Sequence, residues 1–121
     1  MIIEKINLAE KFERIDEYWS PRIAGELNDA YLKLARLNGE FLWHYHENED
    51  ELFLVVKGQL TIKLRGQDIH LGPGELVIIP RGVEHLPVAE SEVHVLLLEP
   101  KTTRHTGNVL SERSQPDRWI D

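Results

Sequence analysis

The sequence contains no cysteine, only one methionine and 7% aromatic residues, and it has no long apolar run. The lack of cysteine excludes disulfides and limits any metal site to histidine and carboxylate ligands. A membrane-spanning helix would need about 20 consecutive apolar residues, so we expect no membrane association. Residues 1–5 also lack the basic start and apolar stretch of a signal peptide. We therefore expect a cytoplasmic protein.

Basic residues are outnumbered and scattered. The chain has 14 Lys and Arg against 21 Asp and Glu, which gives a formal net charge of −7 at pH 7. An acidic chain without a basic stripe is not typical of nucleic-acid binding. The length of 121 residues matches one ordinary domain. We predict a single domain over residues 1–121, with a barrel core at about 30–99 and a C-terminal tail over 100–121.

Short apolar runs dominate the chain from residue 30 onward. Before them, Leu8, Phe12 and Ile15 have helical spacing, and Asn7 can cap such a helix. The later runs are separated by turns rich in Gly, Pro and Asn, a pattern that predicts an all-β sandwich or barrel. The expected strands are 31–37, 40–46, 52–56, 60–64, 69–71, 76–79 and 93–98. Asn38-Gly39 predicts a two-residue hairpin turn between the first two strands.

Two histidines lie close together on one expected strand. His44 and His46 are two residues apart, so both imidazoles face the same side. Burying two imidazoles together is costly unless something pairs with them, and a metal ion is a natural partner. Glu51 begins the next strand. His85 follows a Pro- and Gly-containing turn that, in a closed barrel, can return it to the same mouth.

These residues lie in two stretches that resemble the cupin motifs. Residues 39–58 resemble the first motif, with one residue fewer before the first His, and residues 74–85 resemble the second. The second motif often ends in Asn, where this chain has Ala89. The resemblance implies a double-stranded β-helix, also called a jelly roll, with a short N-terminal helical segment preceding it. It also implies one divalent metal ion (Mn, Fe, Ni, Co, Cu or Zn) with four ligands: His44, His46, Glu51 and His85.

The function is left open by the sequence. The chain is also similar to small single-domain bacterial cupins, some of them described as mannose-6-phosphate-isomerase-like. One hypothesis is a metal-dependent enzyme, of the isomerase or dioxygenase type, that acts on a small polar or phenolic molecule. The alternatives are a non-catalytic module that binds or senses a small molecule, and a barrel with a structural metal. No residue can be assigned as the catalytic base.

Four residues are candidates for contact with a small-molecule ligand: Tyr31, Lys33, Leu42 and Phe53. A two-residue turn at Asn38-Gly39 would place Lys33 opposite His44, inside the barrel. The same register would place Tyr31 opposite His46. A turn of different length would instead send Lys33 to solvent.

A second apolar face is expected on the outside of the barrel, formed by Trp43, Tyr45, Leu52, Leu54 and Val56. Since one face of a closed barrel should be wet, an apolar outer face indicates another layer. The N-terminal segment, the tail or a second subunit could supply it, and we expect a homodimer. The remaining histidines at 70, 94 and 105 are expected to be surface or structural residues.

Overall fold

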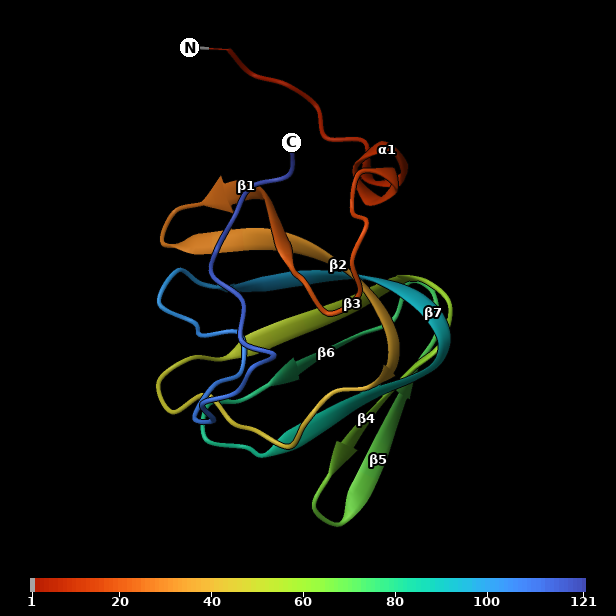
Figure 1. Ribbon diagram of the computed structural model, residues 1–121, viewed down its shortest axis with the longest axis vertical. Coiled ribbons are helices and arrows are strands. Elements are labelled where there is room, and N and C mark those ends of the chain that lie inside the picture. The colour runs from red at the N-terminus through yellow and green to blue at the C-terminus, as the bar shows by residue number, and fades with distance from the viewer. Residues whose placement is uncertain (1) are drawn as a thin grey trace.

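This computed structural model describes residues 2–121. They contain seven strands and one short helix (Figure 1). The elements are α1 (Leu8–Glu13), β1 (Arg22–Leu27), β2 (Ala30–Glu40), β3 (Glu51–Lys57), β4 (Leu60–Leu64), β5 (Gln67–Leu71), β6 (Leu76–Ile79) and β7 (His85–Pro100). Every strand pairing is antiparallel. The all-β class and the N-terminal helix predicted from the sequence are confirmed. No helix within residues 2–121 is long and apolar enough to cross a membrane.

The longest strand, β7, connects the two parts of the barrel. The main sheet has the order β1-β2-β7-β3-β6, while β4 pairs with β5 and with β7. The first residues of β7 pair with β4, and its second half pairs with β3. The two halves of β7 thus pair with different strands. Because β7 is strongly curved, the sheet wraps around a common interior (Figure 1).

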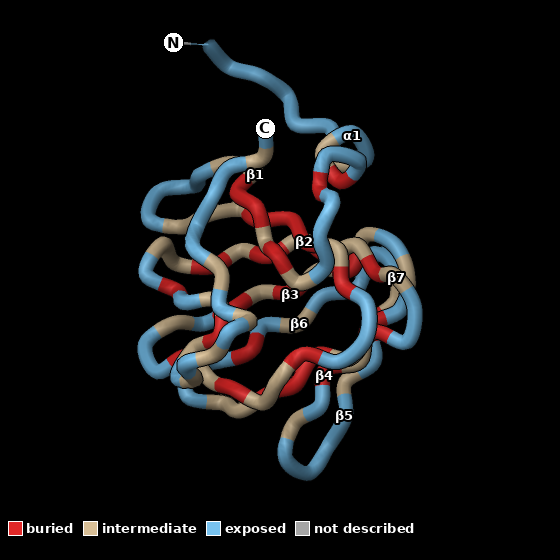
Figure 2. The backbone as a smooth tube through the Cα atoms, in the orientation of Figure 1, coloured by how far each residue is buried: buried red, intermediate tan, exposed pale blue. Residues whose placement is uncertain are grey.

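Helix α1 covers one part of the outer sheet face. Its N-cap is Asn7, whose side-chain oxygen accepts a hydrogen bond from the Glu10 N–H at 3.1 Å, as the sequence predicts. Phe12 and the following Ile15 are buried against Leu34 on β2. Figure 2 shows buried positions, in red, both on α1 and on the strands below it. The N-terminal segment thus supplies part of the extra layer that the apolar outer face requires.

The predicted hairpin at Asn38-Gly39 is wrong. Strand β2 continues through it to Glu40, and the pairing with β7 shifts register between Leu37 and Gly39. Gly39 has φ +88. The positive φ that favours a tight turn here forms a bulge, which bends a long strand without reversing it. Residues 41–50 form no regular strand, so the predicted strand 40–46 is also wrong, and β1 was not predicted.

The barrel interior is apolar at one end and polar at the other. Val55, Val93 and Val95 are fully buried within the main core cluster. Glu51 is the first residue of β3, and Glu99 lies near the end of the antiparallel β7, so both are at the opposite end. The candidate site is at this polar end.

Candidate metal centre and adjoining cavity

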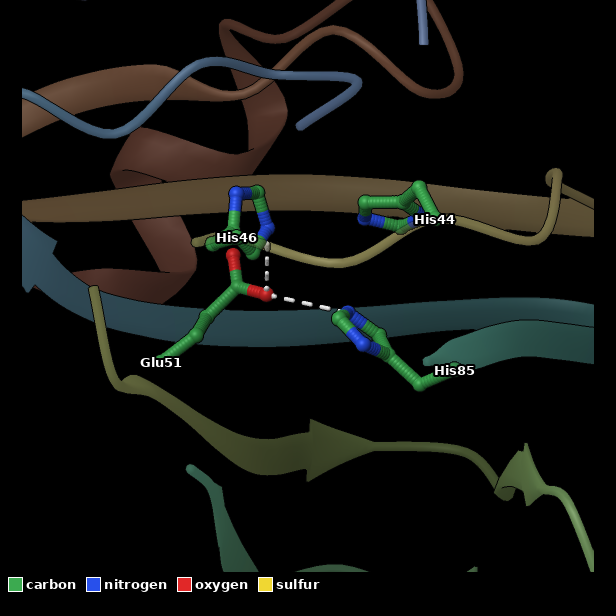
Figure 3. Close-up of side chains that lie close together, drawn as sticks. All are labelled: His44, His46, Glu51 and His85. Carbon is green, nitrogen blue, oxygen red and sulfur yellow. Dashed lines mark ion pairs between the residues drawn. The ribbon is translucent and has the colours of Figure 1, made fainter. Parts of the chain in front are cut away.

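Four buried side chains point toward one another at the polar end of the barrel (Figure 3). His44 and His46 come from the segment before β3, Glu51 begins β3, and His85 begins β7. One potential ligand atom from each residue lies within 4.8 Å of the others, so the group could hold a metal ion. The structure therefore brings together all four residues that the sequence selected.

Backbone hydrogen bonds hold the histidine segment against the turn before β7. The His44 N–H donates to the His85 carbonyl at 3.1 Å, and the His85 N–H donates back at 2.9 Å. The Gly82 N–H donates to the His46 carbonyl at 2.8 Å. These bonds explain how a distant part of the chain returns His85 to the mouth that His44 and His46 face.

Two of the imidazoles are oriented by backbone carbonyls. His44 Nδ1 lies 2.9 Å from the Leu42 carbonyl, and His85 Nδ1 lies 3.0 Å from the Val83 carbonyl. Because a carbonyl oxygen only accepts hydrogen bonds, each Nδ1 carries the proton in the neutral ring. The Nε2 lone pairs are then free for a metal ion, which is the usual arrangement of metal-binding histidines.

The cluster contains most of the unpaired buried side-chain polar atoms in the part of the chain that the structure describes. Within residues 2–121, five buried side-chain atoms have no hydrogen-bond partner: Arg36 Nε, His46 Nδ1, His46 Nε2, Glu51 Oε1 and His85 Nε2. Glu51 Oε1 lies 3.4 Å from the Nε2 atoms of both His46 and His85 (Figure 3). Buried polar atoms are nearly always paired. Three imidazoles and one carboxylate are suitable ligands for a transition metal, so these residues fit a metal ion.

The protonation states also suit metal binding. Burial, helped by the neighbouring His85, lowers the pKa of His44 to about 4. Burial alone would raise the pKa of Glu51, but the adjacent His46 and His85 outweigh it and leave this pKa below its ordinary value. At neutral pH His44 is therefore a neutral imidazole and Glu51 a carboxylate, the forms that coordinate metals.

A cavity adjoins the cluster, and His44 and Glu51 form part of its wall. Its other lining residues within residues 2–121 are mostly apolar: Trp19, Pro21, Ala35, Leu37, Phe41, Phe53, Pro87, Val95, Leu97 and Pro116. The remaining polar ones are Lys33, Glu99, His105, Gln115 and Asp117. Two of the four candidate ligand contacts, Lys33 and Phe53, thus line the cavity. The other two lie outside its lining: Tyr31 packs edge-on against Trp119, and the Leu42 carbonyl contacts His44.

Lys33 lies inside the barrel, but not through the predicted hairpin pairing. It pairs with Leu97 of β7 and Ile23 of β1, and not with His44. Tyr31 pairs with strands β1 and β7 in the same way, not with His46. The alternative in which Lys33 faces solvent is also wrong, because its exposed fraction is 5%. Its position follows from strand pairing across the sheet, which no local turn signal encodes.

Lys33 is paired with two carboxylates. Its Nζ lies 2.7 Å from Asp117 Oδ1 and 3.9 Å from Glu99 Oε2. Burial and the nearby Glu51 carboxylate raise the pKa of Glu99 well above its ordinary value, while Lys33 opposes this rise. Glu99 and Asp117 were not predicted from the sequence.

The C-terminal segment, residues 101–121, closes one side of this region (Figure 1). The Asn108 N–H donates to the Tyr45 carbonyl at 3.0 Å, and Asn108 Oδ1 accepts from the Tyr45 N–H at 2.8 Å. Gly107 has φ +57, and a Cβ there would lie 2.3 Å from the Tyr45 oxygen. Only glycine allows this close approach, so the C-terminal segment supports the backbone between His44 and His46.

His105 belongs to the same segment and was not predicted as a cavity residue. The Gln115 N–H donates to His105 Nδ1 at 3.1 Å. Burial lowers the pKa of His105 to about 4. It therefore contributes a neutral imidazole to the cavity wall. No sequence motif identifies His105 as a cavity residue. The only nearby signal of a specific backbone conformation is the Gly107-Asn108 pair.

The protein is thus an antiparallel β-barrel in which three buried histidines and a glutamate, beside an inner cavity, could hold a metal ion. Residues 35–106 match the Cupin_2 family, the cupin domain, and the chain is a member of this family. A cupin-2 domain protein from Shewanella frigidimarina has a similar crystal structure. It is 45% identical, with a TM-score of 0.78, and the match covers 79% of this chain and 94% of that one.

Three curated relatives match over shorter stretches. The uncharacterized protein YdbB of Bacillus subtilis is 38% identical over 61 residues, half of this chain and 54% of YdbB. Acireductone dioxygenase of the same organism is 31% identical over 49% of this chain and 36% of the enzyme. Quercetin 2,3-dioxygenase, also from B. subtilis, is 40% identical over 35% of this chain and 12% of the enzyme. The chain thus spans about half or less of the length of these relatives.

Proposed function

We propose that this cupin is a metal-dependent enzyme of the dioxygenase type that acts on a small polar or phenolic molecule in the cavity. The observation that carries the proposal is the group of unpaired buried atoms on His46, Glu51 and His85, directly beside a cavity with apolar walls. The similarity to two dioxygenases favours this reaction type over isomerisation, the other type expected from the sequence.

The proposed metal ligands are His44, His46, Glu51 and His85, holding one divalent ion of Mn, Fe, Co, Ni, Cu or Zn. When bound, such an ion supplies Lewis-acid activation and, if it is redox-active, a means of reacting with dioxygen. The protein orients its ligands through the Leu42 and Val83 carbonyls. The walls around Phe53 and Leu97 exclude water from the reacting end of the ligand.

Oxygen consumption tests the proposed function. Iron-loaded protein is mixed with catechol, quercetin and an acireductone in turn, and dioxygen uptake is followed with an electrode. We expect uptake in step with loss of one of these compounds, and none with His46→Ala. If the fully metal-loaded protein binds a ligand but does not turn it over, the result would contradict an enzymatic function and favour a non-catalytic binding module.

A homodimer and a cytoplasmic location are also part of the proposal. On the outer sheet face, Leu76 and Ile78 of β6 have exposed fractions of 52% and 56%. Exposed apolar residues on one face favour a partner surface. Light scattering of the wild type and Ile78→Glu should show a dimer and a monomer, respectively. A monomeric wild type at high micromolar concentration would contradict the dimer.

A further inference from the structure

The cavity wall formed by residues 2–121 contains one lysine and no arginine. Lys33 is nearly fully buried, and burial of an ammonium group is costly unless a carboxylate pairs with it. The carboxylate in direct contact is Asp117, at 2.7 Å, whereas Glu99 is 3.9 Å away. Asp117 also lines the cavity, so the Lys33–Asp117 pair lies where a bound molecule would contact it.

The two carboxylates near Lys33 differ in how firmly they are held. The Glu99 side chain is 4% exposed and belongs to strand β7. The Asp117 side chain is 39% exposed and belongs to the irregular C-terminal segment. Rotation of the Asp117 side chain toward solvent would uncover Lys33 without a change in the barrel. Asp117 is therefore the partner that a ligand could replace.

Lys33 and the metal cluster lie on the same inner face, with the apolar side chains of Leu97 and Phe53 and the buried Glu99 carboxyl between them. Lys33 pairs with Leu97, and Leu97 pairs with Phe53, so the three form a row across β2, β7 and β3. With strands about 4.8 Å apart, the backbones of Lys33 and Phe53 are about 10 Å apart. Glu51 lies two residues before Phe53 on the same face. A molecule in the cavity would therefore meet the Lys33 ammonium at one end, apolar side chains and the Glu99 carboxyl in the middle, and the metal ligands at the other end.

We propose that Lys33 binds a carboxylate of the ligand and that the Asp117 carboxylate occupies this position until the ligand replaces it. The inference rests on the proposed metal-dependent function, because the metal would hold the other end of the ligand. The substrate class is then a small molecule with metal-binding oxygens, a flat apolar body and a carboxylate. Exchange of one carboxylate for another conserves the charge around the buried ammonium, whereas a neutral ligand group would not.

Calorimetric titration of anaerobic zinc-loaded protein with two probes tests this inference. Catechol carries the metal-binding oxygens alone, and 3,4-dihydroxybenzoate adds a carboxylate at the far end. In the wild type we expect the second probe to bind about tenfold more tightly, from one charge-assisted contact offset by displacement of Asp117. Lys33→Met should reduce this ratio to about one. Asp117→Asn should raise the ratio of the two affinities at least about threefold, because an amide competes less strongly than a carboxylate for Lys33.

Matched variants separate the cavity from general charge effects. Lys101→Met removes another ion-paired lysine, bonded to Glu26 at 2.7 Å, and Asp68→Asn removes an exposed carboxylate. Both should leave the ratio unchanged. A ratio that survives Lys33→Met, or that fails to rise in Asp117→Asn, would overturn the inference. If Lys33→Met does not fold, Asp117→Asn alone decides. If the wild type binds neither zinc nor catechol, the result would instead contradict the proposed metal centre.

Discussion

Two clusters in this protein combine a glutamate with histidine, one inside the barrel and one outside. In the outer cluster, Glu92 Oε1 accepts hydrogen bonds from the Tyr18 hydroxyl and from Arg36 Nη2, both at 2.7 Å. Its other oxygen lies 2.7 Å from His94 Nε2. In the inner cluster, the Glu51 oxygen nearest the histidines has only contacts of 3.4 Å.

The difference separates a structural cluster from one that needs a ligand. Both oxygens of Glu92 are paired within the chain, and His94 also stacks on Phe12 of α1, with ring centroids 4.5 Å apart. The outer cluster therefore fastens the N-terminal segment to the barrel. The inner cluster has the same kinds of groups in deeper burial but lacks partners for them, and a metal ion would supply what is missing.

The largest contrast should come from removing the carboxylate charge in each cluster. Glu51→Gln should weaken metal binding about 100-fold or more, because a neutral amide replaces an anionic ligand. Glu92→Gln should leave metal affinity unchanged. Competition with a chromophoric chelator measures both. Equal affinities for the two variants would erase the distinction between the clusters.

Metal should stabilise the folded protein through the inner cluster alone. At a free metal concentration of 100 Kd, the free energy of unfolding should rise by about 2.7 kcal/mol. Urea unfolding with and without metal measures this increment. His85→Ala should lose it, whereas His94→Ala should keep it while lowering the baseline stability. An equal increment in both variants would place the metal elsewhere.

The outer cluster should affect stability and its pH dependence. Glu92→Gln should cost about 1 kcal/mol at pH 7, since hydrogen bonds to a charged group contribute but are partly screened at this exposure. Hydrogen bonds, first from Arg36 and then from Tyr18 and His94, lower the pKa of Glu92 to about 2 from 4.5. This stabilisation is thus present above pH 4.5 and is lost as the pH falls toward 2. A difference that persists undiminished at pH 2 would contradict the assignment.

A smaller effect concerns His105 at the cavity wall. Burial lowers its pKa to about 4 from 6.5, so protons bind the unfolded chain first as the pH falls. The metal-free protein should therefore lose stability between pH 6.5 and 4. His105→Gln should reduce the loss by about 1 kcal/mol, as measured by urea unfolding at pH 7 and 4.5. His70→Gln, an exposed control, should not; the same loss in both variants would exclude His105 as the cause.

The sequence predicted the inner cluster better than the rest of the molecule. The spacing of His44 and His46 predicts that they share a face, whereas Glu51 and His85 were added to the set from the resemblance to the two cupin motifs. Most strands follow from alternation and turn residues. These signals are short-range, and they identify which residues gather without showing how the long strands pair.

The errors came from long-range pairing. Asn38-Gly39 has the local features of a hairpin turn, but pairing of β2 with β7 over most of its length turns it into a bulge. The burial of Lys33 therefore results from the pairing of β2 with β1 and β7, which the sequence did not predict. His105 and Asp117 line the cavity because the irregular C-terminal segment packs there. No periodic sequence pattern predicts where such a segment packs.

Elemental analysis by mass spectrometry tests the central claim most directly, on untagged wild type, His85→Ala and His94→Ala prepared in parallel. We expect about one transition-metal ion per chain in the wild type and in His94→Ala, and less than about a tenth of that in His85→Ala. Equal metal content in all three proteins, or no metal in the wild type after reconstitution, would contradict it.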